Sequence, residues 1–257
     1  MQQQKGCIVI SIDDGSVDHY RLYQLLKSYE VPATFNIITS RMEREGYLTK
    51  EQLREIYQDP LMEIACHGHT HKNTDEDILE ANACLREWLG ATGNGIGFAS
   101  PGSQMKLDFV MENEAHLSSL GLVYVRSADN PSPCARHREL AIQLPAKGAP
   151  ETVLTNISRL IYSIDGMYLP SAVVYQHTPV EDLKALADLA IQEGACLIVM
   201  LHRVEKPGEP HWENTWCYDF DKTEQFLRHI KKREQEGAVE LLTTRDMFEK
   251  RYPEKSH

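Results

Sequence analysis

The sequence predicts a single distorted (β/α) barrel of about seven units over residues 1–257, with mostly parallel strands and with helices outside. Short apolar runs rich in β-branched residues alternate along the chain with amphipathic segments of helical period. About seven such units in one chain favour a barrel over an open doubly wound sheet, which is the alternative fold. No linker or internal repeat in the sequence indicates a second domain.

The individual elements are predicted from hydrophobic periodicity and from helix-capping residues. Thr49 and Gln52 form a capping box at the start of one helix, and Gly90 ends the next helix. The proline-rich segment 127–150 is predicted to be loop, and no strand can be assigned within 154–175. The expected strands are 7–12, 33–38, 61–66, 96–99, 122–125, 196–201 and 239–242. The expected helices are 17–29, 49–57, 75–89, 106–120, 180–192, 221–235 and a closing segment from Thr244.

Composition excludes several classes of function. Acidic residues outnumber Lys and Arg by 38 to 27, giving a net charge of −11, which argues against nucleic acid or an anionic membrane as a partner. No run of about 18 apolar residues occurs, so no membrane span is predicted. The six cysteines are scattered without a C-x-x-C pair, and the first residues lack the apolar core of a signal peptide. We therefore expect a cytoplasmic protein, and no pattern in the sequence specifies its oligomeric state.

A pair of adjacent carboxylates ends the first predicted strand, where Asp13 and Asp14 precede Gly15. Two carboxylates at the end of a buried strand repel each other and need a cation nearby. A metal ion would supply that charge, whereas a solvated Asp-Gly turn is the alternative.

Histidines further along the chain favour the metal. His67, His69 and His71 lie within five residues, directly after a predicted strand, and His202 follows another apolar strand. Imidazole nitrogens together with a carboxylate suit zinc or a similar divalent ion, and Cys66 is a further candidate ligand. The C-terminal ends of parallel strands gather on one face of a barrel, where active sites are found. The shared position of these residues at strand ends therefore predicts one site.

Three motifs, in this order, resemble those of the metal-dependent polysaccharide deacetylase family, which carries the NodB-homology domain. They are Ser11-Ile-Asp13-Asp14-Gly15, His67-x-x-x-His71 and Met200-Leu-His202. The resemblance extends from about residue 7 to residue 247 and implies a distorted (β/α) barrel.

The resemblance also implies residue roles. Asp14, His67 and His71 would bind the metal, which is expected to be zinc, with cobalt, nickel or manganese as alternatives. Asp13 would be the general base and His202 the general acid.

One family residue is displaced in this chain. Ala99 stands where many members carry an arginine that pairs with the base. Tyr124-Val-Arg126-Ser, at the next strand end, resembles the Y-A-R-T of members that also have alanine at the earlier place. We therefore expect Arg126 to contact Asp13, in a bidentate geometry, and to belong to the catalytic residues. The alternative is an ordinary surface arginine.

Other residues near the motifs have less defined roles. His69 has no counterpart among the family's ligands and is expected to contact solvent or to support its neighbours. Asp129 lies near the position of a family aspartate that orients the acid, but its sequence context matches poorly. Trp212 and Trp216 could stack on sugar rings or could serve as packing anchors.

The function implied by the resemblance is hydrolytic removal of acetyl groups from a carbohydrate, foremost the N-acetyl group of an amino sugar. The expected partner is thus an acetylated carbohydrate or a small N-acyl substrate. Two alternatives stay open. One is deacylation of a small non-sugar amide or ester, and the other is a carbohydrate-binding protein that keeps the metal without turnover.

Overall fold

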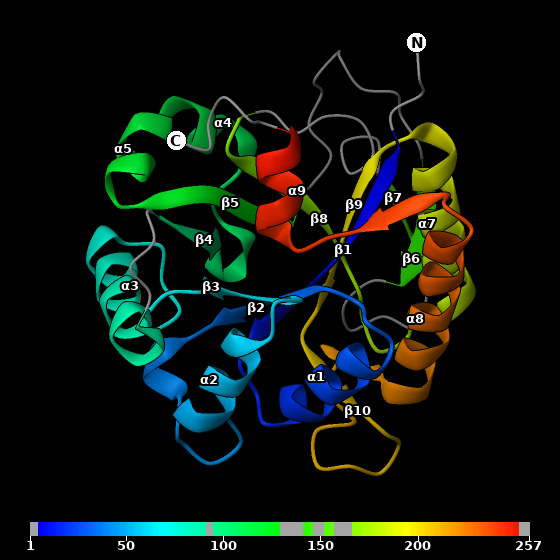
Figure 1. The fold of residues 1–257 in the computed structure, drawn as a ribbon, viewed down its shortest axis with the longest axis horizontal. Coiled ribbons are helices and arrows are strands. Elements are labelled where there is room, and N and C mark those ends of the chain that lie inside the picture. Colours follow the sequence, from blue (N-terminus) through cyan, green and yellow to red (C-terminus); the bar gives the residue numbers. More distant parts are fainter. Residues whose placement is uncertain (1–4, 91–94, 129–140, 146–151, 157–165, 252–257) are drawn as a thin grey trace.

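The computed structural model describes residues 5–90, 95–128, 141–145, 152–156 and 166–251 (Figure 1). Seven parallel strands close into a barrel in the order β1-β2-β3-β4-β5-β8-β9, because β9 pairs with β1 as well as with β8. The strands are β1 (Gly6–Asp14), β2 (Ala33–Ile37), β3 (Met62–Cys66), β4 (Ile96–Ala99), β5 (Leu122–Ala128), β8 (Tyr168–Val173) and β9 (Cys196–Leu201). The predicted barrel is confirmed, while the organisation of all 257 residues as one domain stays a prediction.

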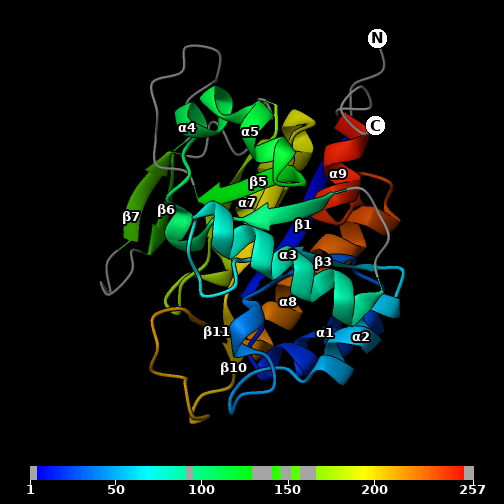
Figure 2. The same ribbon diagram turned by 90° about the vertical axis from the view of Figure 1, so that its left-hand side faces the viewer.

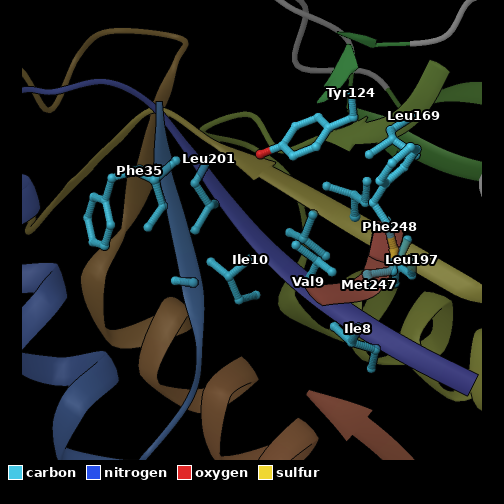
Figure 3. Close-up of a cluster of buried hydrophobic side chains, with 14 of the residues drawn as sticks. Ile8, Val9, Ile10, Phe35, Tyr124, Leu169, Leu197, Leu201, Met247 and Phe248 are labelled. Carbon is cyan, nitrogen blue, oxygen red and sulfur yellow. The ribbon is translucent and has the colours of Figure 1, made fainter. Parts of the chain in front are cut away.

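β1 is the strand on which the barrel is assembled. Its first residues, 6–8, pair with β12 (Val239–Leu241), and residues 10–14 of the same strand pair with β2. Residues 7–12 pair with β9 in addition. Such a strand has no edge or face open to water, which explains its nearly continuous run of apolar residues. Figure 3 shows Ile8, Val9 and Ile10 along β1 within the buried cluster.

Helices lie outside the strands (Figures 1 and 2). The capping box of Thr49 and Gln52 forms as predicted at the start of α2, and Gly90 ends α3 in the left-handed conformation. The outer helices are α1 (Asp18–Ser28), α2 (Lys50–Gln58), α3 (Asp75–Leu89), α4 (Leu107–Glu112), α5 (Glu114–Ser119), α7 (Val180–Glu193), α8 (Phe220–Gln235) and α9 (Thr244–Arg251). Within the described part of the chain, none of the helices combines the length and apolar character needed to cross a membrane.

Two sequence predictions were wrong in detail. The helix expected over 106–120 is divided into α4 and α5, because the backbone leaves the helical region at Asn113. Part of the expected loop 127–150 forms β6 (Ala141–Pro145), which pairs antiparallel with β7 (Thr152–Asn156). Figure 2 places this hairpin to one side of the barrel.

The strand β8 lies in the region to which no strand could be assigned. Pro170 stands in its middle and pairs in register with Ser127 of β5. Proline is rare inside a central strand, so its presence obscured the strand pattern. The short strands β10 (Arg203–Glu205) and β11 (Cys217–Asp219) follow β9 and pair with each other.

Candidate metal and catalytic site

The two adjacent aspartates have different surroundings at the end of β1. Asp13 is buried at 2% exposure, whereas the Asp14 side chain is 27% exposed. Asp14 takes a left-handed backbone with φ 85°, and Gly15 follows with φ 78°. This turn ends the strand and separates the two carboxylates, so that one lies inside the barrel and the other at its rim.

Asp14, His67 and His71 form a group that fits a divalent ion. One ligand atom from each lies within 4.8 Å of the other two. The Nδ1–H of His67 donates to the carbonyl oxygen of Ala99 at 2.7 Å, which leaves Nε2 with its lone pair available. That Nε2 lies 3.9 Å from Oδ1 of Asp14. A histidine whose second nitrogen donates to a carbonyl is oriented as metal-binding histidines usually are. Two imidazoles and one carboxylate leave further coordination positions open.

The loop after β3 holds His71 in an unusual backbone conformation. His71 has φ 66°, and Gly68 has φ 79° with no room for a side chain, since an added Cβ would lie 2.9 Å from the carbonyl oxygen of Lys72. The carboxylate of Asp77, at the start of α3, accepts hydrogen bonds from the backbone N–H groups of Thr70 and Lys72 at 2.9 and 3.0 Å. Asp77 therefore holds the loop on both sides of His71. Burial lowers the pKa of His71, which favours the neutral form that binds metals.

Asp13 is kept ionised by groups from other strands. Arg126, on β5, donates from Nη2 to Oδ1 of Asp13, and Nδ2 of Asn36 donates to the same oxygen at 2.8 Å. Burial by itself raises the pKa of Asp13, but the charge of Arg126, helped by His67 and His202, outweighs burial and lowers it to about 2. Asp13 is thus a fixed negative charge inside the barrel.

The predicted contact between Arg126 and Asp13 is confirmed, but its predicted bidentate geometry was wrong. Nη1 of Arg126 donates to Sδ of Met200 instead of to the second carboxylate oxygen. That second oxygen, Oδ2, faces two imidazoles, at 3.8 Å from Nε2 of His67 and 3.9 Å from Nε2 of His202. One oxygen of Asp13 is therefore held by donors, and the other is directed toward the site.

His202 lies directly after β9, with its ring against an aromatic pair. The ring centroid of Trp216 lies 4.4 Å from that of His202, and the ring of Tyr175 lies 5.1 Å from Trp216. Burial lowers the pKa of His202 to about 4, against the opposing effect of Asp13. At neutral pH His202 is therefore uncharged in this state. Trp216 packs on the histidine, and the carbonyl oxygen of Trp212 accepts a hydrogen bond from the Gln176 amide.

Other sequence candidates lie outside this group. Nδ1 of His69 is 2.9 Å from Oγ1 of Thr39, and its Nε2 is 3.3 Å from Glu80. Cys66 is fully buried, and burial raises the pKa of its thiol to about 12, so it does not offer a thiolate. Asp129 lies outside the described residues.

Sequence reasoning missed Asn36 and Asp77. Asn36 interrupts an otherwise apolar strand, which was a usable signal, because a buried amide needs a specific partner. Asp77 lies in an acidic first turn of α3 and resembles any favourable helix start. Its contacts with the loop could not be read from spacing.

Comparison with known proteins finds similarity to polysaccharide deacetylases. The family model for polysaccharide deacetylase matches residues 1–117. The "Putative polysaccharide deacetylase YxkH" of Bacillus subtilis is 34% identical over 77 residues, covering 30% of this chain and 25% of that protein. The poly-beta-1,6-N-acetyl-D-glucosamine N-deacetylase of Staphylococcus aureus is 31% identical over 88 residues, covering 30% of each. The matches thus span less than a third of the length of these relatives.

Solved structures share the fold over nearly the whole chain. The "putative polysaccharide deacetylase" of Mycobacterium smegmatis has a TM-score of 0.61 at 14% identity and covers 100% of this chain and 94% of that one. A family 4 acetyl xylan esterase from Clostridium thermocellum, in complex with a cobalt ion, has a TM-score of 0.52 at 16% identity and covers 94% and 90%. At these identities the likeness concerns the fold, and the family model concerns the N-terminal motifs. Over its first 117 residues this chain is thus similar to the polysaccharide deacetylase family, and it shares the fold of solved polysaccharide deacetylases.

Proposed function

We propose that this protein is a metal-dependent deacetylase that hydrolyses acetyl groups from a carbohydrate, foremost the N-acetyl group of an amino sugar. The observation that carries the proposal is the position of Asp13. Its Oδ2 lies between a metal-ligand histidine and the histidine that follows β9, at 3.8 and 3.9 Å. A base and an acid beside a metal-binding group are the components that hydrolysis of an acyl bond needs.

Asp14, His67 and His71 would hold the ion, which we expect to be zinc. When bound, a divalent ion supplies Lewis acidity toward water and toward the acyl carbonyl. His67 is prepared for this role by its hydrogen bond to Ala99, and His71 by the loop that Asp77 holds.

Asp13 would accept the proton of the attacking water at Oδ2. Arg126 and Asn36 both donate to Oδ1, so they fix the carboxylate without occupying the oxygen that takes the proton. The low pKa keeps Asp13 available as a base through the neutral range.

His202 would transfer a proton to the departing amine. Because it is uncharged in the free state, it needs to receive a proton before it can donate one. Oδ2 of Asp13 lies 3.9 Å from Nε2 of His202 and is the group from which we expect His202 to receive this proton. The water proton would move from Asp13 to Nε2 of His202 and then to the leaving nitrogen, while the new C–O bond forms and the C–N bond breaks.

The proposed substrate class is supported by the similarity to polysaccharide deacetylases and by an aromatic side chain beside the site. A relative that deacetylates poly-beta-1,6-N-acetyl-D-glucosamine supports an amino sugar. The ring of Trp216, partly exposed beside His202, offers an apolar surface of the kind that packs against sugar rings. The cytoplasmic location expected from composition stays a prediction.

An activity panel tests the proposal. The purified protein should release acetate from N-acetylglucosamine oligomers, and a chelator should abolish the release until zinc is restored. Activity restricted to O-acetylated xylan or to small non-sugar amides would reassign the substrate. Zinc binding without release from any of them would replace the deacetylase with a binding protein.

The variant Asp13→Asn separates binding from chemistry. It keeps the three ligands and should bind zinc with the affinity of the wild type, while hydrolysis falls by about 10²–10⁴-fold because the base is lost. Near-normal turnover in this variant would contradict the role of Asp13.

A further inference from the structure

The first turn of α1 contacts the segment that carries His202. His19 is fully buried, at 0% exposure, and its Nε2 lies 2.7 Å from the main-chain carbonyl oxygen of His202. Oγ of Ser16 lies 3.0 Å from the same nitrogen. A carbonyl oxygen only accepts hydrogen bonds, so Nε2 of His19 carries the hydrogen and donates it. Nδ1 of His19 has no partner within the described part of the chain, so Nε2 is the ring's polar anchor.

A neighbouring residue holds the same segment two residues further on. Oδ2 of Asp18 accepts a hydrogen bond from the backbone N–H of Val204 at 2.8 Å, and its Oδ1 accepts one from Arg203 at 3.2 Å. Two successive side chains of α1 therefore hold the main chain on both sides of Arg203. They belong to the helix that begins four residues after Asp14.

The main-chain anchor is important because the ring of His202 has few other restraints. Its Nδ1 is buried and has no hydrogen-bond partner among the residues that the structure describes. Its ring packs against Trp216, a contact that limits tilt without fixing distance to Asp13. The position of the His202 backbone is thus what sets Nε2 at 3.9 Å from Oδ2 of Asp13.

We propose that His19 is a positioning residue for His202, and this inference rests on the proposed function. By donating to the carbonyl oxygen of His202, His19 links the backbone of the proposed acid to α1. This helix follows the proposed base, Asp13, and the proposed metal ligand, Asp14, in the sequence. The hydrogen bond from His19 then fixes the distance between Oδ2 of Asp13 and Nε2 of His202, across which the proton moves. Displacing a reacting group by about 1 Å costs roughly 10²-fold in rate, so loss of this tie should be visible in turnover.

Two substitutions distinguish the hydrogen bond from mere filling of space. The amide nitrogen of Gln reaches about as far as Nε2 of histidine, whereas that of Asn ends near the position of Nδ1. His19→Gln should keep the donor and most of kcat. His19→Asn should lower kcat by about 10–10²-fold, with KM and zinc affinity within about twofold of the wild type. His116→Asn, at an exposed histidine beside Asp75, is the control and should leave kcat unchanged.

An NMR measurement keeps the inference independent of the substrate. The ring ¹⁵N resonances of His202, followed in the zinc-bound protein, should shift in His19→Asn and return to wild-type positions in His19→Gln. If they do so while no substrate is hydrolysed, the proposed function fails and the positioning role stands. If turnover is present but both variants match the wild type, or both lose it equally, the positioning role is overturned. Should His19→Asn not fold, Asp18→Ala, which frees the N–H of Val204, is expected to move the same resonances.

Discussion

The guanidinium that contacts Asp13 comes from β5, next to the strand on which the family resemblance placed it, and the backbone register explains how. Ala99 of β4 and Arg126 of β5 are direct partners in the sheet, and the backbone N–H of Ser100 donates to the carbonyl oxygen of Arg126 at 2.8 Å. Neighbouring strands are about 4.8 Å apart, which an arginine side chain can span. An arginine at position 99 or at position 126 could thus place its guanidinium beside Asp13.

The register of positions 99 and 126 predicts how variants at these two positions behave. Arg126→Ala should bind zinc normally but lose about 10²-fold or more in kcat, because Asp13 would lose its cation and one donor to Oδ1. Adding Ala99→Arg to that variant should restore part of the activity, since the two positions are in register. Zinc titration and steady-state kinetics on the three proteins check this. An unchanged kcat in Arg126→Ala would refute the role given to the guanidinium.

At the scale of elements, the loop between β3 and α3 depends on one carboxylate. Asp77 accepts from the N–H and the hydroxyl of Thr70, the latter at 2.6 Å, and from the N–H of Lys72. Burial by itself raises the pKa of Asp77, but these hydrogen bonds outweigh it and lower the pKa, so the side chain is ionised at neutral pH. The positive φ of His71 is an uncommon conformation for a residue with a side chain, and it persists because the surrounding loop is held.

Removing that carboxylate should weaken metal binding through His71. We expect Asp77→Ala to raise the zinc dissociation constant by about 10–100-fold, the usual cost of losing a group that orients a ligand. Asp75→Ala is the matched control, because Asp75 lies in the same helical turn but pairs with His116 at the surface, 2.9 Å away. Competition with a fluorescent chelator measures both. Equal affinities in the two variants would show that the loop does not depend on Asp77.

The sequence predicted elements well where one pattern dominated. The strands and helices up to residue 89 followed from periodicity and capping. The six candidate site residues were chosen from strand ends and from motifs that resemble those of the family, and their roles stay predictions. β8 was missed because Pro170 breaks its pattern, and β6 because it lies in a proline-rich segment and itself ends in Pro145. The second partner of Arg126 was missed because the choice between Oδ2 of Asp13 and Sδ of Met200 depends on side-chain positions across the barrel. Periodicity carries no such information.

For the whole molecule, the buried ion pair links stability to pH. The pKa of Asp13 is lowered from 3.8 to about 2 in the folded protein. A lowered carboxylate pKa stabilises the fold fully above the unfolded value, and this stabilisation is lost as pH falls from about 4 toward 2. A shift of this size corresponds to about 2 kcal/mol.

In chelator, the unfolding free energy of the wild type should therefore fall more steeply below pH 4 than that of Asp13→Asn. Asp221→Asn serves as the control, because Asp221 is an exposed partner of Lys206 and should keep the wild-type slope. Urea unfolding at pH 5, 4 and 3 gives the comparison. Identical slopes in wild type and Asp13→Asn would mean that Asp13 is not held ionised by Arg126.

The pairing of β1 with distant strands also has a consequence for how the protein is made. The proposed base, Asp13, and the three proposed metal ligands all lie within the first 71 residues. The strand that precedes the proposed acid, His202, comes much later and pairs Cys196 with Cys7. Domains tend to fold from the N-terminus as the chain emerges, and closures between distant segments are slow. If the proposed function holds, a growing chain has its metal ligands long before β9 is synthesised. We then expect that metal binding can begin on the ribosome, whereas hydrolysis has to wait until the barrel closes.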